Sequence, residues 1–187
     1  MYVPDEIIPP DHRTDGASAG FHFAVARMEG ENFIPAAHYG EIENLAELPA
    51  AAVHIAWLAV ADQEGHNQFL QEKQVSDPTG IRRTKHFKLI DMGFAFGNPD
   101  WAAATLAPAT PSYTLPRHMI EKLTSANLRN AIAALKSVSD TSIEQCLTDC
   151  PQEWAIQQND RDAVLERAIR ARDDIKNTIF LDNPTIL

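Results

Sequence analysis

Three side chains that can accept a proton or bind a cation follow one another in the middle of the chain. Asp62 is followed five residues later by Asn67, and Asp91 comes after a further apolar segment, in the run Leu-Ile-Asp-Met-Gly. Enzymes that transfer phosphoryl groups use the same order. In them an Asp accepts the proton of the attacking hydroxyl, an Asn five residues later binds one Mg²⁺, and a second Asp binds the metal at the nucleotide phosphates. The spacing therefore indicates a candidate site for phosphoryl transfer.

These residues can act as one site only if the elements around them bring them together. Residues 69–72 and 86–90 predict two short strands, joined by a polar loop that includes residues 77–83. A hairpin of these strands would place Asn67 just before it and Asp91 just after it. Both side-chain oxygens would then lie at one end of the hairpin, as a shared metal site requires.

The rest of the chain is expected to be mainly helical. Residues 1–20, rich in Pro, Asp, Gly and Ala, predict an extended segment, residues 21–25 predict a strand, and residues 28–32 predict the turn after it. Apolar residues at helical spacing, a proline at a first turn and a serine cap predict the helices. We expect them over residues 41–48, 49–59, 116–123, 125–135, from about 140, and 160–180. Residues 49–59 are apolar on nearly every side, so that helix should be buried and should lead into Asp62.

Charge is distributed unevenly along the chain. The net charge is −10, and residues 1–72 contain two basic residues, Arg13 and Arg27, against twelve acidic ones. No basic stripe is available to neutralise nucleic-acid phosphates, and no apolar run reaches the ~20 residues of a membrane span, so we expect neither partner. The acidic half suits cation binding, although a solvated acidic surface explains it as well. The N-terminus lacks a signal-peptide pattern, and Cys146 and Cys150 suit a reducing compartment, so a cytoplasmic location is expected.

Two longer segments resemble one protein family. Residues 57–67 and residues 88–97, Lys-Leu-Ile-Asp-Met-Gly-Phe-Ala-Phe-Gly, resemble the catalytic and metal-binding segments of HipA-like kinases. The helical tail, with Cys-Pro-Gln-Glu-Trp at residues 150–154 and a final Arg-rich helix, resembles the end of that domain. The resemblance implies an α+β, mainly α fold in one domain over residues 1–187. This would be the C-terminal lobe of a protein-kinase-like fold, with a short β-hairpin carrying the metal-binding loop. It also implies transfer of the ATP γ-phosphate to a Ser or Thr.

The same resemblance implies roles for single residues. Asp62 becomes the catalytic base, and Asn67 and Asp91 become ligands of Mg²⁺ or Mn²⁺, with ATP as the phosphate donor. The lobe that grips the nucleotide in such kinases carries a Gly-rich loop and a Lys. It is absent or highly reduced here, because the chain has no lysine before Lys73 and no G-x-G-x-x-G. The sequence therefore assigns no nucleotide-binding residue. A protein that supplies this lobe, an antitoxin-like regulator or a protein substrate is the expected partner.

Several functional interpretations fit these residues. The chain can be an ATP-dependent phosphotransferase lobe that is incomplete alone, or a non-catalytic, pseudokinase-like module that binds a kinase, a toxin or a target protein. Small-molecule phosphotransferases of the aminoglycoside or choline kinase type share the Asp-x-x-x-x-Asn spacing and a later Ile-Asp. An α-rich domain with an incidental acidic loop would show the same pattern.

Overall fold

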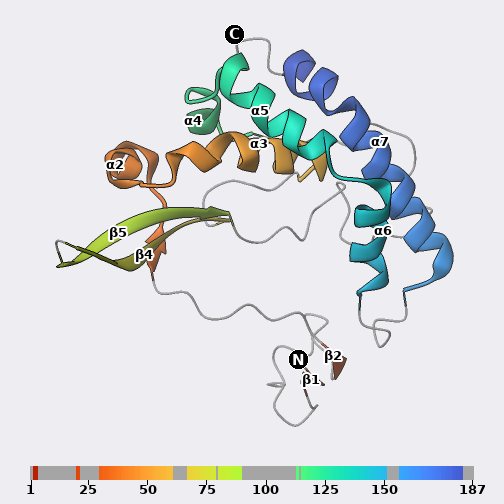
Figure 1. The fold of residues 1–187 in the computed structure, drawn as a ribbon, viewed down its shortest axis with the longest axis horizontal. Helices are drawn as coiled ribbons and strands as arrows, with labels where there is room; N and C mark the ends of the chain where they lie inside the picture. The colour runs from red at the N-terminus through yellow and green to blue at the C-terminus, as the bar shows by residue number, and fades with distance from the viewer. Residues whose placement is uncertain are drawn as a thin grey trace, which may run out of the picture.

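The computed structural model has an α+β fold in which helices predominate and a small antiparallel sheet lies against one side of them (Figure 1). It describes residues 2–3, 20–21, 30–60, 67–78, 80–89, 113, 115–150 and 156–182. The sheet has the strand order β3-β4-β5. The strands are β3 (Gly30–Asn32), β4 (Gln68–Asp77) and β5 (Gly80–Leu89), with β1 (Tyr2–Val3) and β2 (Gly20–Phe21) forming a separate pair. The helices are α2 (Pro35–His38), α3 (Leu48–Trp57), α4 (Arg117–Ile120), α5 (Ser125–Lys136), α6 (Asp140–Thr148) and α7 (Gln158–Asp182), with 3-10 turns at Tyr39–Glu41 and Leu45–Glu47.

Helix α3 is the centre of the helical layer and confirms the expectation of a buried helix there. It contacts both α5 and α7, and Figure 1 shows it running below α5, with α7 on the right-hand side. Its side chains Ala52 and Ile55 are fully buried, as are Leu128 of α5 and Ile175 of α7. The indole Nε1 of Trp57 donates a hydrogen bond to the carbonyl oxygen of Ala168 at 2.9 Å, which fixes α3 to the middle of α7. Burial of aliphatic side chains from three helices thus supplies the main core.

The hairpin β4–β5 is present but longer than the sequence predicts. Gln68 pairs with Leu89 at one end and Asp77 pairs with Gly80 at the other, so each strand has ten residues. Arg82 and Arg83, expected in the connecting loop, instead lie within β5. The distal half of the hairpin is polar and mostly exposed, so it carries no alternation of buried and exposed side chains from which its length could be read.

A short extended segment covers the outer edge of β5 where a helix was expected over residues 41–48. Ile42 forms a parallel bridge with Lys85, and the amide of Glu43 donates to the carbonyl oxygen of Lys85 at 3.0 Å. The side chain of Asn44 then replaces a strand neighbour for Phe87. Its Nδ2 donates to the Phe87 carbonyl at 3.0 Å, and its Oδ1 accepts from the Phe87 amide at 2.8 Å. These contacts satisfy buried backbone groups that a helix at 41–48 would have left without partners.

Strand β3 occupies part of the segment 28–32 that the sequence predicts to be a turn. Gly30, Glu31 and Asn32 pair with β4 from Gln71 to Phe69. A Cβ atom on Gly30 would lie 2.2 Å from the carbonyl oxygen of Leu70, so the absence of a side chain permits the close approach of the two strands. The glycine therefore marks a tight strand contact rather than a turn.

The remaining helices agree with the expected positions except at their ends. The N-cap of α5 is Thr124 and not Ser125, because Thr124 and Asn127 form a reciprocal capping box. Helix α4 covers four residues rather than the eight expected over 116–123. Cys146 and Cys150 are free thiols near the end of α6. The expected strand over 21–25 lies, beyond Phe21, outside the described residues.

Candidate functional site

Asn67 is the candidate site residue that the structure places. Its side chain is 2% exposed, and it lies immediately before the first pair of the hairpin, Gln68 with Leu89. Two of the three predicted site residues, Asp62 and Asp91, lie outside the described residues. Asp91 follows Leu89 by two positions in the sequence. The hairpin thus ends at Gln68 and Leu89, next to the sequence positions of both expected metal ligands.

A partly buried hydrogen-bond network begins at the residue next to Asn67. The Oε1 of Gln68 lies 2.5 Å from Nε2 of His118, and Nδ1 of His118 lies 2.6 Å from the hydroxyl oxygen of Tyr39. Burial lowers the pKa of His118, so the ring is neutral near pH 7. A neutral ring that donates from Nε2–H to Gln68 accepts the Tyr39 hydroxyl proton at Nδ1. Burial, with the negative charge of Glu121, raises the pKa of Tyr39 to about 12, which keeps this hydroxyl a donor.

Aromatic rings surround this network and join it to the sheet. The ring of Phe33 makes edge contacts with Tyr39, at 5.4 Å between centroids, and with Phe87, at 4.8 Å. The His118 ring lies 5.3 Å from the Phe33 ring. The amide of Phe33 also donates to the carbonyl oxygen of Gln68 at 3.0 Å. Packing and hydrogen bonds together hold the backbone that follows Asn67 in one position.

The end of α3 directs the chain toward Asp62 through a strained turn. The amide of Val60 donates to the carbonyl of Ile55 at 3.0 Å, and the amide of Ala59 donates to the carbonyl of Ala56 at 3.2 Å. This is the Schellman arrangement of a helix C-terminus, in which the residue after the cap is left-handed and usually Gly. Here Ala59 has a φ of 49°. An L-residue other than Gly in this conformation costs roughly 1–2 kcal/mol.

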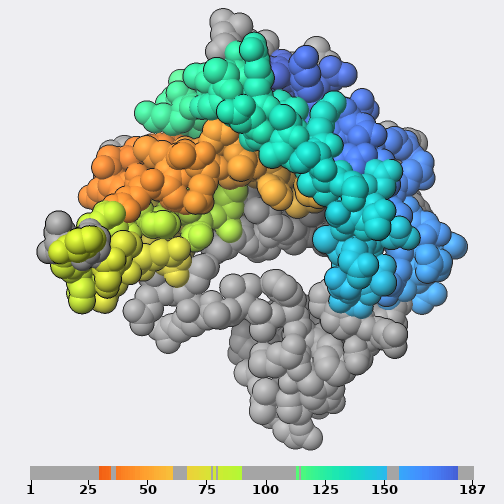
Figure 2. Space-filling view, viewed as in Figure 1, coloured from red at the N-terminus to blue at the C-terminus, as the bar shows by residue number. Residues whose placement is uncertain are grey.

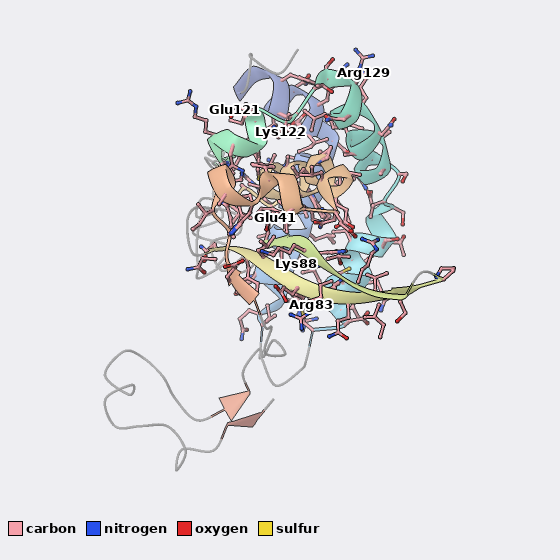
Figure 3. The ribbon with its side chains drawn as sticks, turned by 90° about the vertical axis from the view of Figure 1, so that its left-hand side faces the viewer. Glu41, Arg83, Lys88, Glu121, Lys122 and Arg129 are labelled. Carbon is pink, nitrogen blue, oxygen red and sulfur yellow. The ribbon has the colours of Figure 1, made fainter. Side chains whose placement is uncertain are left out.

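A hollow of about 530 Å³ lies on the three-stranded sheet. Gly30 and Glu31 of β3 line it together with residues of β4, among them Leu70 and Lys73, and with Arg83 of β5. Figure 3 shows Arg83 and Lys88 extending from β5 on the sheet side of the molecule. The volume is within the range of small-molecule sites, and the lining carries both cations and carboxylates.

Several residues of this region have no signature in the sequence. Gln68 and His118 are fifty residues apart, and Tyr39 and His118 are seventy-nine apart, so no local spacing connects them. Asn44, whose side chain bonds to the backbone at the edge of β5, likewise has no local sequence pattern that identifies it. A polar residue inside an otherwise apolar run is the only sign that such residues give before the fold is known.

The described residues provide no complete metal site on their own. Within the described ranges, no three His, Cys, Asp or Glu side chains gather as metal ligands. The expected ligand set contains one such residue, Asp91, beside the carboxamide of Asn67, and Asp91 lies outside those ranges. Carboxamide and carboxylate oxygens are suitable ligands for Mg²⁺ or Mn²⁺.

No model of a protein family, no curated protein and no solved structure matches this chain. In the part of the chain that is described, none of the helices combines the length and apolar character needed to cross a bilayer.

Proposed function

We propose that the chain is an ATP- and Mg²⁺-dependent phosphotransferase lobe, resembling HipA-like Ser/Thr kinases and incomplete by itself. Asn67 and Asp91 would hold the divalent cation, and Asp62 would be the catalytic base. In the transfer, the oxygen of a Ser or Thr hydroxyl forms a bond to the γ-phosphorus while the bond from that phosphorus to ADP breaks. ADP leaves with the bonding electrons, and the hydroxyl proton passes to Asp62.

The pairing of Gln68 with Leu89 is the observation that supports this proposal most directly. Asn67 adjoins one member of this pair, and Asp91 follows the other by two residues. Two residues span at most about 7 Å of chain, so a carboxylate two positions after Leu89 is within reach of the hairpin end. A cation shared with the buried carboxamide of Asn67 would require Asp91 to turn toward it.

We place the nucleotide in the hollow on the sheet. Leu70, at its wall, is three residues from Asn67 along β4, or about 10 Å in a strand. Lys73 and Arg83 supply positive charge there, although Arg83 also lies 3.7 Å from Glu72. The two cations suit the negatively charged phosphates of a nucleotide, whereas Leu70, which is 1% exposed, belongs to the buried core.

A second function, a non-catalytic module that binds a protein partner, is favoured by what the sequence lacks. It has no lysine before Lys73 and no G-x-G-x-x-G, the parts that hold ATP phosphates in kinases. Phosphoryl transfer depends on positioning and charge stabilisation, so residues 1–187, tested without those parts, are expected to have little of the rate. The isolated chain is therefore expected to bind ATP weakly and to turn it over slowly or not at all.

The experiment that tests the proposed function measures binding of ATP with Mn²⁺ by calorimetry, followed by transfer of labelled γ-phosphate. The wild type, Asp91→Asn and Asp174→Asn are compared. Asp174 is an exposed residue of α7, so its variant has the same charge change away from the site. We expect Asp91→Asn to weaken metal–nucleotide binding by at least about tenfold, as loss of a ligand or its support does, and Asp174→Asn to leave it unchanged.

The outcomes separate the two functions. Metal-dependent binding with transfer that Asp62→Asn abolishes identifies an active lobe. Metal-dependent binding without transfer, even when candidate partner proteins are added, favours the non-catalytic module. Equal binding by all three proteins in the calorimetric comparison contradicts a metal site at Asn67 and Asp91.

A further inference from the structure

A second hollow lies on the opposite side of the helical layer from the sheet. Helices α5 and α7 run side by side on the outer surface there (Figure 2), and a groove of about 590 Å³ lies between them. Residues from one stripe of α5, at helical spacing, form one wall, and two residues one turn apart on α7 form the other. The lining residues are Ser125, Arg129, Ile132, Ala133 and Lys136 of α5, and Lys176 and Phe180 of α7. We call this the α5–α7 groove.

The α5–α7 groove is positively charged in a protein whose net charge is −10. Its three charged residues, Arg129, Lys136 and Lys176, are all cations. In the described part of the chain, none of the three has a carboxylate within ion-pair distance. Two other cations of α7 are paired in contrast: Arg170 with Glu166, and Arg172 with Asp140 at 2.6 Å. Among the described residues, the groove thus concentrates cations that no carboxylate neutralises.

The floor of the groove is apolar. Ile132 is 6% exposed, Phe180 is half-buried, and Ala133 is exposed between them and the rim. Nucleic-acid surfaces cluster Lys and Arg in basic patches or stripes, whereas this groove has three cations around an apolar floor in a chain whose net charge is −10. An apolar floor with charged flanks is the form of grooves that receive an amphipathic helix.

We propose that the α5–α7 groove binds an acidic amphipathic helix of a partner protein. Arg129 and Lys136 are seven residues apart on α5, or about 10.5 Å along its axis. Carboxylates at positions i and i+7 of a helix lying along α5 have the same separation. Apolar side chains between them would then face Ile132, Ala133 and Phe180.

This surface is independent of the candidate phosphotransferase site. Figure 3 shows Arg129 on α5 at the far side of the helical layer from Arg83 and Lys88 on the sheet. A partner in the α5–α7 groove would leave the hairpin end at Asn67 uncovered. Binding of a helix in the α5–α7 groove can therefore be tested separately from phosphoryl transfer.

The test uses the full chain and a fluorescein-labelled helical peptide with a Leu stripe flanked by Glu, read by fluorescence anisotropy. A peptide of the same length with Lys in place of every Glu is the matched probe. We expect the Glu peptide to bind, the Lys peptide to bind at least tenfold more weakly, and the Glu peptide to lose affinity between about 50 mM and 300 mM salt.

Two pairs of variants locate the binding site. Ala133→Trp fills the groove without a charge change, and Ala134→Trp places the same ring one residue away; both alanines are exposed, so the core is not disturbed. Lys176→Glu reverses a groove cation, and Lys122→Glu reverses an exposed lysine outside the groove lining. We expect Ala133→Trp and Lys176→Glu each to weaken binding at least tenfold, and the two controls to change it less than twofold.

Three outcomes would overturn the proposal. One is no binding of the Glu peptide at the highest soluble protein concentration. Another is an equal loss of affinity in each variant and its control. The third is binding of a DNA duplex or of anionic phospholipid vesicles that Lys176→Glu abolishes while the Glu peptide stays unbound, because the groove would then recognise phosphate groups and not an acidic helix.

Discussion

Substitution of Asn44 by Ala should destabilise the protein strongly, although Asn44 is a single polar residue outside the helices and strands. Its carboxamide makes two hydrogen bonds with the backbone of Phe87, at 3.0 and 2.8 Å. Asn44 is 8% exposed and Phe87 is 4% exposed, so water has little access to either group. The variant leaves the amide and the carbonyl of Phe87 without their partners.

The magnitude follows from those two backbone groups. A buried polar group without a partner costs about 1–3 kcal/mol, which gives about 2–6 kcal/mol for the pair. Ala is smaller than Asn, so a water molecule can enter and recover part of this loss. We therefore expect a decrease of about 2–4 kcal/mol in the free energy of unfolding, or about 5–15 °C in Tm for a chain of this size.

Urea denaturation followed by circular dichroism measures this loss, with two comparisons. Asn130→Ala removes an exposed carboxamide of α5 and should change stability by less than about 0.5 kcal/mol. Asn44→Asp keeps the shape and the acceptor for the Phe87 amide but sets an oxygen against the Phe87 carbonyl, so it should cost at least as much as Asn44→Ala. A loss below about 1 kcal/mol for Asn44→Ala, or a neutral Asn44→Asp, would refute the role of this carboxamide as a substitute strand partner.

Further predictions concern the backbone and the buried ring network. Gly30→Ala should destabilise the sheet by more than about 2 kcal/mol, because its Cβ would lie 2.2 Å from the Leu70 carbonyl oxygen; a near-neutral melt would show that β3 can move aside. Ala59→Val should lower the free energy of unfolding by about 2 kcal/mol or more, and Ala59→Gly by less than about 1 kcal/mol, because the φ of residue 59 is 49°. Equal melting temperatures for the two variants would contradict the strained turn. Burial lowers the pKa of His118 in the folded state, so the unfolded state binds the proton first and the free energy of unfolding should fall as pH drops below about 6.5. Urea midpoints measured at several pH values should show a weaker fall for His118→Gln than for the wild type. Identical pH profiles for the two proteins would exclude the His118 ring as the cause.

The sequence predicts the helices well because their burial is periodic. Leu128, Ile132 and Leu135 recur at helical spacing, and the structure buries all three in α5. The buried helix before Asp62 was also found, because α3 is apolar on nearly every side. The sequence does not predict the distal part of the hairpin, since Arg82 and Arg83 lie in the stretch of β5 over residues 80–83 in which every residue is exposed to water. A strand without a buried face has no period to detect.

The residues around the candidate site are harder to predict from the sequence than the helices are. Local spacing selected Asn67, and the structure places it at the end of a hairpin, as expected. Nothing in the sequence selected Gln68, His118 or Tyr39, because their contacts join segments fifty or more residues apart. Nor does the sequence indicate Asn44, whose role depends on β5 being the outer strand of the sheet β3-β4-β5 in the described part of the chain. Contacts of this kind follow from tertiary packing, which local patterns do not encode.

The most direct test of the central claim is whether Asn67 and Asp91 bind the same cation. The side-chain amide resonances of Asn67, assigned by NMR in the wild type, are followed during a titration with Mn²⁺, which broadens nuclei close to it. We predict selective broadening of the Asn67 amide at low Mn²⁺ in the wild type and in Asp174→Asn, and its loss in Asp91→Asn. An Asn67 amide that stays sharp in the wild type, or that broadens equally in Asp91→Asn, would contradict the metal site.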